Sequence, residues 1–192
     1  MSFLAPRGVF CYIPRIEFTP GKEGDLARVA VVMGSASDLA AMSEALGILE
    51  EFAIPHEVRV LSAHRSPDAV ATFAEKAEGE GFAVIIAGAG KAAHLPGVIA
   101  AKTTLPVIGV PMETRLAGGL DSLLSIAQMP RGVPVATMGT GRSGAANAAI
   151  LAVEILALGD EALRERLVAY KKKLADDVAA SDRQVREELG PK

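Results

Sequence analysis

A histidine and an arginine follow directly on an apolar, β-branched run in the segment "VRVLSAHRSPD" (58–68). The side chain of His64 is of the one type whose unperturbed pKa suits proton transfer near neutral pH. Arg65 has the paired donors that bind phosphate or carboxylate. A strand that ends here, before the helix-opening "SPD", places both side chains at the carboxyl edge of a sheet, where open α/β sheets bind ligands. The segment therefore predicts an enzyme acting on a phosphorylated small molecule.

A second candidate segment is "MGSASD" (33–38), which ends the first predicted strand. Ser35 and Ser37 offer hydroxyl groups where a helix begins, and the free N–H groups of a helix N-terminus hold phosphate well. A simple cap, with Ser37 or Asp38 at the N-cap position, explains the same residues. Both interpretations stay open from this segment alone.

The third segment is "AGAGKAAHLPG" (87–97), which is rich in glycine and alanine. Such small residues let the backbone approach a ligand closely, and they would equally allow tight packing of a helix on the sheet. We interpret His94 within it as a hydrogen-bonded core residue rather than a catalyst. His56, beside Pro55 in a predicted loop, is interpreted as solvated.

Other kinds of site find no support in the sequence. No two histidines have the spacing of a helical metal site, and the single Cys11 cannot build a zinc site. The glycine segments match neither the dinucleotide-binding nor the P-loop motif, and no nucleophile elbow occurs. We therefore expect proton chemistry on a bound phosphate ester, with no metal and no cofactor.

Short apolar runs alternate with helix-length segments from residue 27 onward. Their continuous rather than alternating hydrophobicity predicts a parallel sheet covered on both faces, joined by right-handed crossovers. The predicted strands are 28–33, 57–62, 82–88, 106–111 and 134–139. The predicted helices between them are 37–53, 66–81, 92–103 and 120–129. This is an α/β fold: a three-layer sandwich around a five-stranded parallel sheet.

Two further helices are predicted in the last third of the chain. Residues 142–158 form an apolar, small-residue helix that could be buried on nearly all sides. A long charged helix follows, with an apolar stripe on one face. The stripe consists of Leu163, Leu167, Tyr170, Leu174 and Val178. Such a stripe suits packing on a neighbouring subunit and, as well, closure of the chain's own core.

The chain divides into an N-terminal extension (1–26), one catalytic domain (27–158) and a C-terminal helix (159–192).

The composition of the chain limits the classes of function. A net charge of −3 and a pI of about 5.7 argue against a nucleic-acid binder. No apolar run approaches the ~20 residues of a membrane helix. With no signal peptide and one cysteine, we expect a cytoplasmic protein. The mean hydropathy of +0.30 favours a homo-oligomer.

Several segments, in order between about residues 28 and 158, resemble a known family. They include "VVMGSASD", "VLSAHRSPD", "VIIAGAGKAAHLPGVIAAKT" and "GLDSLLSIAQMPRGVPVAT". The family is that of the bacterial 5-(carboxyamino)imidazole ribonucleotide mutases, also called the phosphoribosylaminoimidazole carboxylase catalytic subunit. The resemblance implies a flavodoxin-like αβα sandwich and a homo-octamer with active sites at subunit junctions. It implies an isomerase of de novo purine biosynthesis that moves a carboxyl group from nitrogen to ring carbon 4 of a nucleotide.

Matched positions imply roles for individual residues. His64 would carry the proton, and the phosphate, ribose and ring would meet a set of substrate-binding residues. These are Ser35, Ser37, Asp38, Ser62, Ala63, Arg65, Ala89, Gly90, Lys91, Ala92 and Leu95. The "AAHLPG" form resembles the mutase class more than the class that fixes carbon dioxide directly.

The chain departs from the family pattern in two places. Lys91 stands where the pattern usually has a glycine, and "GTGRS" (139–143) stands where an apolar residue and a lysine are expected. Two alternatives therefore remain beside the mutase. One is a direct carboxylase of aminoimidazole ribonucleotide, and the other is a nucleotide-binding protein in which Lys91 obstructs the chemistry.

Overall fold

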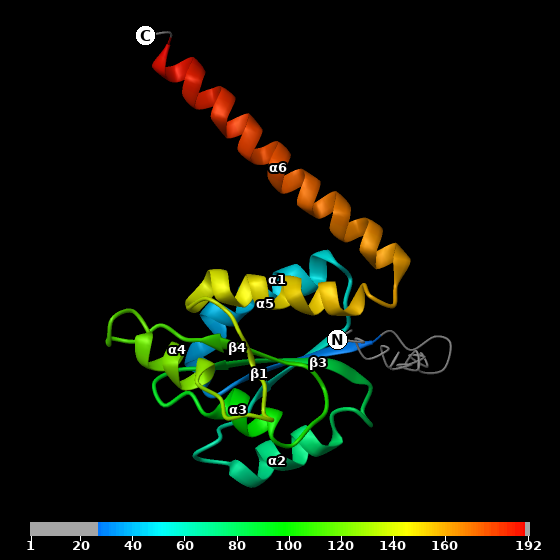
Figure 1. Cartoon of the computed structure of the whole chain (residues 1–192), viewed down its shortest axis with the longest axis vertical. Helices are drawn as coiled ribbons and strands as arrows, with labels where there is room; N and C mark the ends of the chain where they lie inside the picture. The colour runs from blue at the N-terminus through cyan, green and yellow to red at the C-terminus, as the bar shows by residue number, and fades with distance from the viewer. Residues whose placement is uncertain (1–26, 191–192) are drawn as a thin grey trace, which may run out of the picture.

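The computed structural model describes residues 27–190, so the extension over 1–26 lies outside the described residues. Its centre is a five-stranded sheet in the order β2-β1-β3-β4-β5, with every neighbouring pair parallel (Figure 1). The strands are β1 (Arg28–Met33), β2 (His56–Val60), β3 (Phe82–Ala89), β4 (Val107–Pro111) and β5 (Ala136–Thr137). The predicted flavodoxin-like α/β fold is confirmed.

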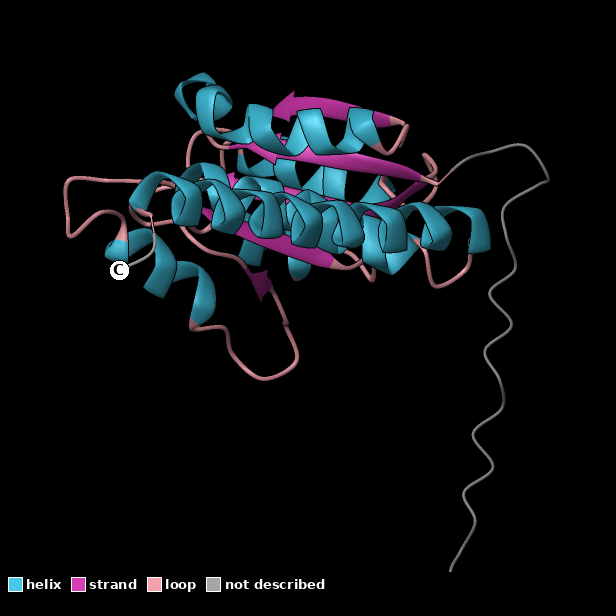
Figure 2. Ribbon diagram, turned by 90° about the horizontal axis from the view of Figure 1, so that it is seen from above, coloured by secondary structure: helices cyan, strands magenta, loops and turns pink. Residues whose placement is uncertain are grey.

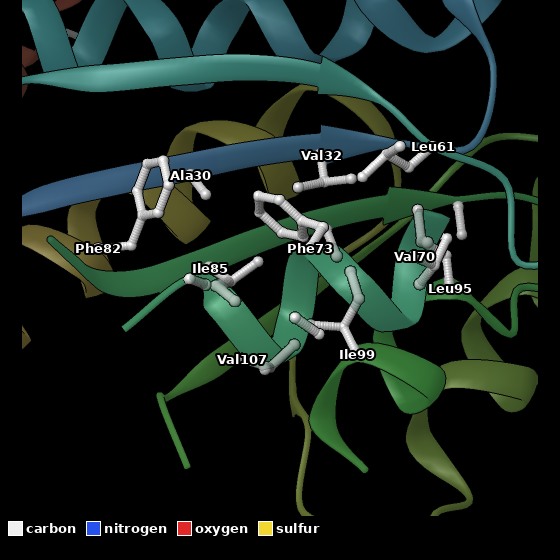
Figure 3. Packing of buried hydrophobic residues seen from close by; sticks show 14 of the residues in the cluster. Ala30, Val32, Leu61, Val70, Phe73, Phe82, Ile85, Leu95, Ile99 and Val107 are labelled. Carbon is white, nitrogen blue, oxygen red and sulfur yellow. The ribbon is translucent and has the colours of Figure 1, made fainter. Parts of the chain in front are cut away.

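Helices cover both faces of the sheet, which makes the molecule a three-layer sandwich (Figures 1 and 2). On one face lie α1 (Leu39–Glu51) and α5 (Gly141–Leu156). On the other lie α2 (Pro67–Lys76), α3 (Leu95–Ala100) and α4 (Leu120–Ala127). Each layer has its own hydrophobic core, and Figure 3 shows the one beneath α2 and α3.

The continuous hydrophobicity of the central strands has a simple cause. Successive side chains of a strand point to opposite faces of the sheet. In β1, Ala30 and Val32 therefore join the core with α2 and α3, while Val29 and Val31 join the core with α1 and α5. Both faces are buried from Val29 to Met33, so every position there is apolar.

Close packing around the sheet depends on small residues. A Cβ atom at Gly88 in β3 would lie 2.7 Å from Sδ of Met42 in α1. Helix α5 packs on α1 through buried alanines, among them Ala145, Ala148 and Ala152. Few residues of α5 are exposed, and most of the helix is buried or half-buried, in line with the prediction from its small, apolar sequence.

The sheet edges differ from expectation. Val58 and Val60 in β2 are 40% and 55% exposed, although this strand was expected to be covered on both faces. The reason is its place in the sheet, where β2 has β1 as its single neighbour. At the opposite edge, the predicted strand 134–139 is reduced to the two residues of β5. The helix predicted over 92–103 likewise shortens to the six residues of α3.

The first predicted helix, 37–53, begins with a separate turn of 3-10 helix, η1 (Ala36–Asp38), ahead of α1. The last predicted helix forms as one long element, α6 (Glu161–Leu189). Its first turns close the chain's own core, because Leu163 and Leu167 pack with Phe52 and Val153. From Lys171 onward every described residue of α6 is exposed, and the helix projects away from the sandwich (Figure 1).

Among residues 27–190, no helix is both long enough and apolar enough to cross a lipid bilayer.

Candidate active site

Three loops meet at the carboxyl edge of the sheet, as the sequence predicts. They follow β1, β2 and β3, which are neighbours in the sheet. Backbone hydrogen bonds tie them together: Gly34 N donates to Gly88 O at 3.2 Å, and Leu61 N donates to Met33 O at 2.9 Å. The site residues named from the sequence all lie in these loops or at the elements they join.

Two histidines form the centre of this group. Nε2 of His64 and Nδ1 of His94 are 2.8 Å apart, so one ring nitrogen donates a hydrogen bond to the other. The rings meet edge to face, with centroids 4.8 Å apart. Both side chains are exposed. The interpretation of His94 as a core residue is therefore wrong.

The position of His94 explains that error. It directly precedes α3, and its neighbours Ala93 and Leu95 are each 2% exposed. An apolar sequence around a histidine thus suggests burial, but the turn before α3 points the intervening side chain outward to His64. His56, in contrast, begins β2, where its Nδ1 lies 3.0 Å from Ile54 O, so it is half-buried in a strand rather than in a loop.

Arg65 joins the loops after β1 and β2. Its Nη2 donates to Gly34 O at 2.7 Å, and its Nε donates to Ser62 Oγ at 3.2 Å. The backbone N of Arg65 also donates to Ser62 Oγ, at 3.3 Å. The side chain remains exposed. Arg65 therefore holds a positive charge in a fixed position on the exposed side of the three loops.

The loop after β1 is a compact cluster of hydroxyls and one carboxylate. Ser35 Oγ accepts hydrogen bonds from Ser37 N at 3.3 Å and from Ser37 Oγ at 2.9 Å, and so caps η1. Asp38 stands at the N-cap position of α1 but makes no capping bond with its side chain. Partial burial raises the pKa of the Asp38 carboxyl, against the opposing effects of hydrogen bonds and of the Arg65 charge. A simple helix cap accounts for Ser35 but not for Asp38, whose Oδ1 lies 3.2 Å from Ser37 Oγ.

The loop after β3 runs from Ala89 to His94. Ala89 is buried, while Lys91 and Ala92 are exposed. Lys91 has a φ of +61°, a left-handed conformation that is uncommon for any residue other than glycine. Its side chain is exposed, so the charged ammonium group is not buried.

The remaining predicted residues differ in their surroundings. Ser62 and Ala63 are half-buried in the loop after β2, beside the histidine. Gly90 faces Met112, whose Cβ would lie 3.2 Å from a Cβ placed at Gly90. Leu95 belongs to the core beneath the sheet, with Val70 and Ile99 (Figure 3).

Two serines of α4 were missed by the sequence reasoning. Ser122 Oγ accepts a hydrogen bond from Lys91 N at 2.9 Å, and Ser125 Oγ lies 3.2 Å from Lys91 O. The signal in the sequence is the pair of serines in "LDSLLSIA", one helical turn apart. No group of three His, Cys, Asp or Glu side chains within residues 27–190 is arranged to hold a metal ion.

The chain has relatives among known proteins. The family model described as AIR carboxylase matches residues 28–177. The chain belongs to the AIR carboxylase family. The matched range contains all three loops and more than half of α6.

Individual relatives within this family are close in sequence. An Escherichia coli K12 protein named N5-carboxyaminoimidazole ribonucleotide mutase is 57% identical over 152 residues, which are 79% of this chain and 90% of the relative. A Mycobacterium tuberculosis H37Rv protein of the same name is 54% identical over 167 residues, covering 87% and 95%. A Bacillus subtilis relative with that name is 52% identical over 157 residues, covering 82% and 97%.

Among solved structures, the crystal structure of Treponema denticola PurE superposes with a TM-score of 0.76 at 25% identity. The superposition covers 83% of this chain and 99% of the other. The AIR carboxylase membership and the fold thus agree.

Proposed function

We propose that this protein isomerises N5-carboxyaminoimidazole ribonucleotide to 4-carboxy-5-aminoimidazole ribonucleotide in de novo purine biosynthesis, with His64 as the proton carrier. The names of its relatives support the reaction. The single observation that carries the mechanism is the 2.8 Å contact between His64 and His94, beside the charge of Arg65. A proton carrier and an anion-binding group thus lie together at one edge of the sheet.

The reaction needs one bond broken and one formed. The bond between the exocyclic nitrogen and the carboxyl carbon breaks, carbon dioxide leaves, and the electron pair stays on nitrogen, which takes up a proton. Ring carbon 4 of the resulting electron-rich aminoimidazole then attacks carbon dioxide. The adduct loses its proton from carbon 4 and regains aromaticity.

One group can both supply the proton and take it back. A protonated His64 gives its proton to the exocyclic nitrogen and recovers one from ring carbon 4, so the enzyme ends as it began. The hydrogen bond to His94 fixes the orientation of the His64 ring, and it engages Nε2. That leaves Nδ1 of His64 as the atom that meets the substrate. General acid–base catalysis of this kind typically contributes 10²–10⁴-fold.

The substrate phosphate and ribose belong, in this proposal, at the loop after β1. Ser35 and Ser37 present hydroxyl groups at the start of η1 and α1, where backbone N–H groups favour an anion. Arg65 supplies the opposite charge from the next loop. Asp38 suits the ribose hydroxyls, since a carboxylate accepts hydrogen bonds. Ser62 holds the guanidinium of Arg65 in place.

The imidazole ring then lies toward the loop after β3. Ala63, Ala89, Gly90 and Ala92 are small, so the backbone can approach the flat ring closely. Leu95 forms the floor from the core side. Lys91, which is exposed, is placed to meet a carboxylate or phosphate rather than to obstruct the ring.

The proposal includes a homo-octamer with sites at subunit junctions. Both the histidine pair and Arg65 are exposed in one chain, and a site for decarboxylation gains from exclusion of water. Exposed apolar side chains are available for contact with a second copy. They include Val58 and Val60 of β2 and Leu174, Val178, Val185 and Leu189 of α6.

The apolar stripe of α6 supports this assembly. Leu163, Leu167 and Tyr170 cover the chain's own core, and Leu174, Val178 and Ser181 follow at the same spacing eleven residues later. Val185 and Leu189 begin the next repeat. A sustained 11-residue repeat is typical of helices that pack along their length.

One assay separates the three candidate reactions. The purified full-length protein is mixed with N5-carboxyaminoimidazole ribonucleotide, and formation of the 4-carboxy product is followed without added bicarbonate. Rapid product formation supports the mutase. Turnover that requires aminoimidazole ribonucleotide and bicarbonate would establish the carboxylase instead. Nucleotide binding without either turnover would establish the non-catalytic alternative.

A further inference from the structure

Ser122, the third residue of α4's "LDS" opening, has an unusual environment. It is 0% exposed, and within residues 27–190 it is the polar side chain that is fully buried. Its Oγ accepts a hydrogen bond from Lys91 N, 2.9 Å away in the loop after β3. A buried hydroxyl is costly unless it is hydrogen-bonded, so this contact fixes where the loop lies against α4.

The partner residue holds a strained backbone conformation. Lys91 has a φ of +61°, where the Cβ of an L-residue crowds its own backbone. The contact from Ser122 holds the N–H of Lys91. Ser125 Oγ lies 3.2 Å from Lys91 O, but its single proton has a shorter acceptor in Asp121 O, at 2.8 Å. The direct hold of α4 on this strained residue is therefore the hydrogen bond from its N–H to Ser122.

Asp121 orients the hydroxyl of Ser122. Its Oδ1 accepts a hydrogen bond of 2.6 Å from Thr114 Oγ1 and lies 3.5 Å from Ser122 Oγ. The hydrogen bond from Thr114 lowers the pKa of the Asp121 carboxyl, which keeps it an ionised acceptor. The Ser122 proton is thus directed to Asp121, and a lone pair is left for Lys91 N–H.

The turn at Lys91 determines where the chain goes next. Three residues later, His94 N donates to Ala92 O at 2.8 Å, and the His94 ring contacts His64. We propose that Ser122 is a positioning residue for this histidine pair, acting through the left-handed turn at Lys91. The inference rests on the proposed function only in assuming that the pair carries the catalytic proton.

A competing explanation is that burial alone positions His94. Ala93 and Leu95, on either side of it, are each 2% exposed and anchored in the core. On that explanation the hydroxyl of Ser122 contributes to stability and leaves the histidines unaffected. The two explanations differ in how much Ser122→Ala should lower kcat when residue 91 is glycine. Glycine adopts a positive φ without steric cost, so the turn then needs no support from Ser122.

The experiment is a double-mutant cycle of Ser122→Ala and Lys91→Gly in the full-length protein, well below the melting temperature. We expect Ser122→Ala to lose amide hydrogen-exchange protection at Lys91 and to lower kcat by at least about tenfold, with KM little changed. In the Lys91→Gly background, the same serine substitution should cost much less of kcat. Ser43→Ala, which removes an exposed hydroxyl that donates to Ala40 O in α1, is the matched control and should change neither quantity.

Two results would overturn the inference. One is an unchanged kcat for a folded Ser122→Ala protein that has lost protection at Lys91, since burial alone would then position His94. The other is an equal loss of kcat in both backgrounds, which would exclude action through the turn. If the parent protein lacks mutase activity, the proposed function fails by itself. The cycle is then read from the distance between His64 and His94 in crystals of the variants, and an unchanged pair in Ser122→Ala overturns the inference.

Discussion

His64 and His94 meet across two loops, and in the proposed mechanism they and their neighbours carry out proton transfer and anion binding. His64→Asn should lower kcat by 10²-fold or more, the usual contribution of a general acid–base group, while substrate binding is largely kept. Steady-state kinetics and a direct binding measurement check this. His56→Asn is the matched control, because His56 lies at the start of β2 and contacts Ile54 O. More than about a tenth of the parent rate in His64→Asn would refute the role of His64.

Arg65 is exposed yet makes hydrogen bonds to two loops. Arg65→Ala should weaken substrate binding by about 1.5–3 kcal/mol, the range of a charge-assisted hydrogen bond. Calorimetric titration with the substrate measures the change. Arg59→Ala, which removes an arginine paired with Glu57 in β2, should leave the affinity as it was. Equal affinities in the two variants would mean that the phosphate binds elsewhere.

Asp38 should show a conflict between stability and function. Its pKa is raised by partial burial, so the folded state holds the proton more tightly than the unfolded chain does. The stability from this carboxyl is therefore present below its ordinary pKa and is lost as the pH rises through the raised value.

Asp38→Asn removes the charge. We expect it to be as stable as the parent or more stable at pH 7, because the partly buried carboxylate no longer has to be charged there. This advantage should disappear in acid. Denaturant unfolding at pH 7 and pH 3 tests the trend, and substrate affinity should fall at the same time. A clear loss of stability at pH 7 would contradict it.

Elements with strong local signals were predictable, and short elements at the sheet edges were not. β1 and β3 are buried on both faces, so their hydrophobicity identified them, together with the loops they deliver. β2 carries Glu57 and Arg59 between its apolar residues, and its exposure follows from its place at the edge of the sheet. The residues of the site also differ in how far the sequence predicts them. His64 follows a clear strand, while Ser122 acts from a helix distant in sequence, through a contact that no local pattern encodes.

α6 gives the prediction at the level of elements. Val178 is 70% exposed in one chain, so Val178→Glu should leave the fold of the sandwich intact. If the stripe packs on a second copy, a buried charge there should dissociate the assembly. Val168, 65% exposed on the same helix but outside the stripe, provides the control Val168→Glu. Sedimentation velocity compares the two, and an identical mass distribution for both would rule out the stripe as an interface.

For the molecule as a whole, the fold and the family could be predicted from the sequence, because the βαβ alternation and the loop segments run in order along the chain. The assembly rests on less specific features: high mean hydropathy and exposed apolar side chains. We expect light scattering at micromolar concentration to report eight times the 19.9 kDa of one chain. A monomer would contradict the octamer and a site shared between subunits.

The helical order of the projecting half of α6 should also depend on protein concentration. Beyond Lys171 its backbone hydrogen bonds receive no tertiary support from the chain's own sandwich. Isolated helices of this length are marginal in water, because nucleation is unfavourable and each added residue contributes little. In a dissociated chain this segment should therefore exchange between helix and coil. If the proposed assembly forms, circular dichroism on dilution should show the helical signal fall as the copies separate. The end of one chain would then fold only when another is present.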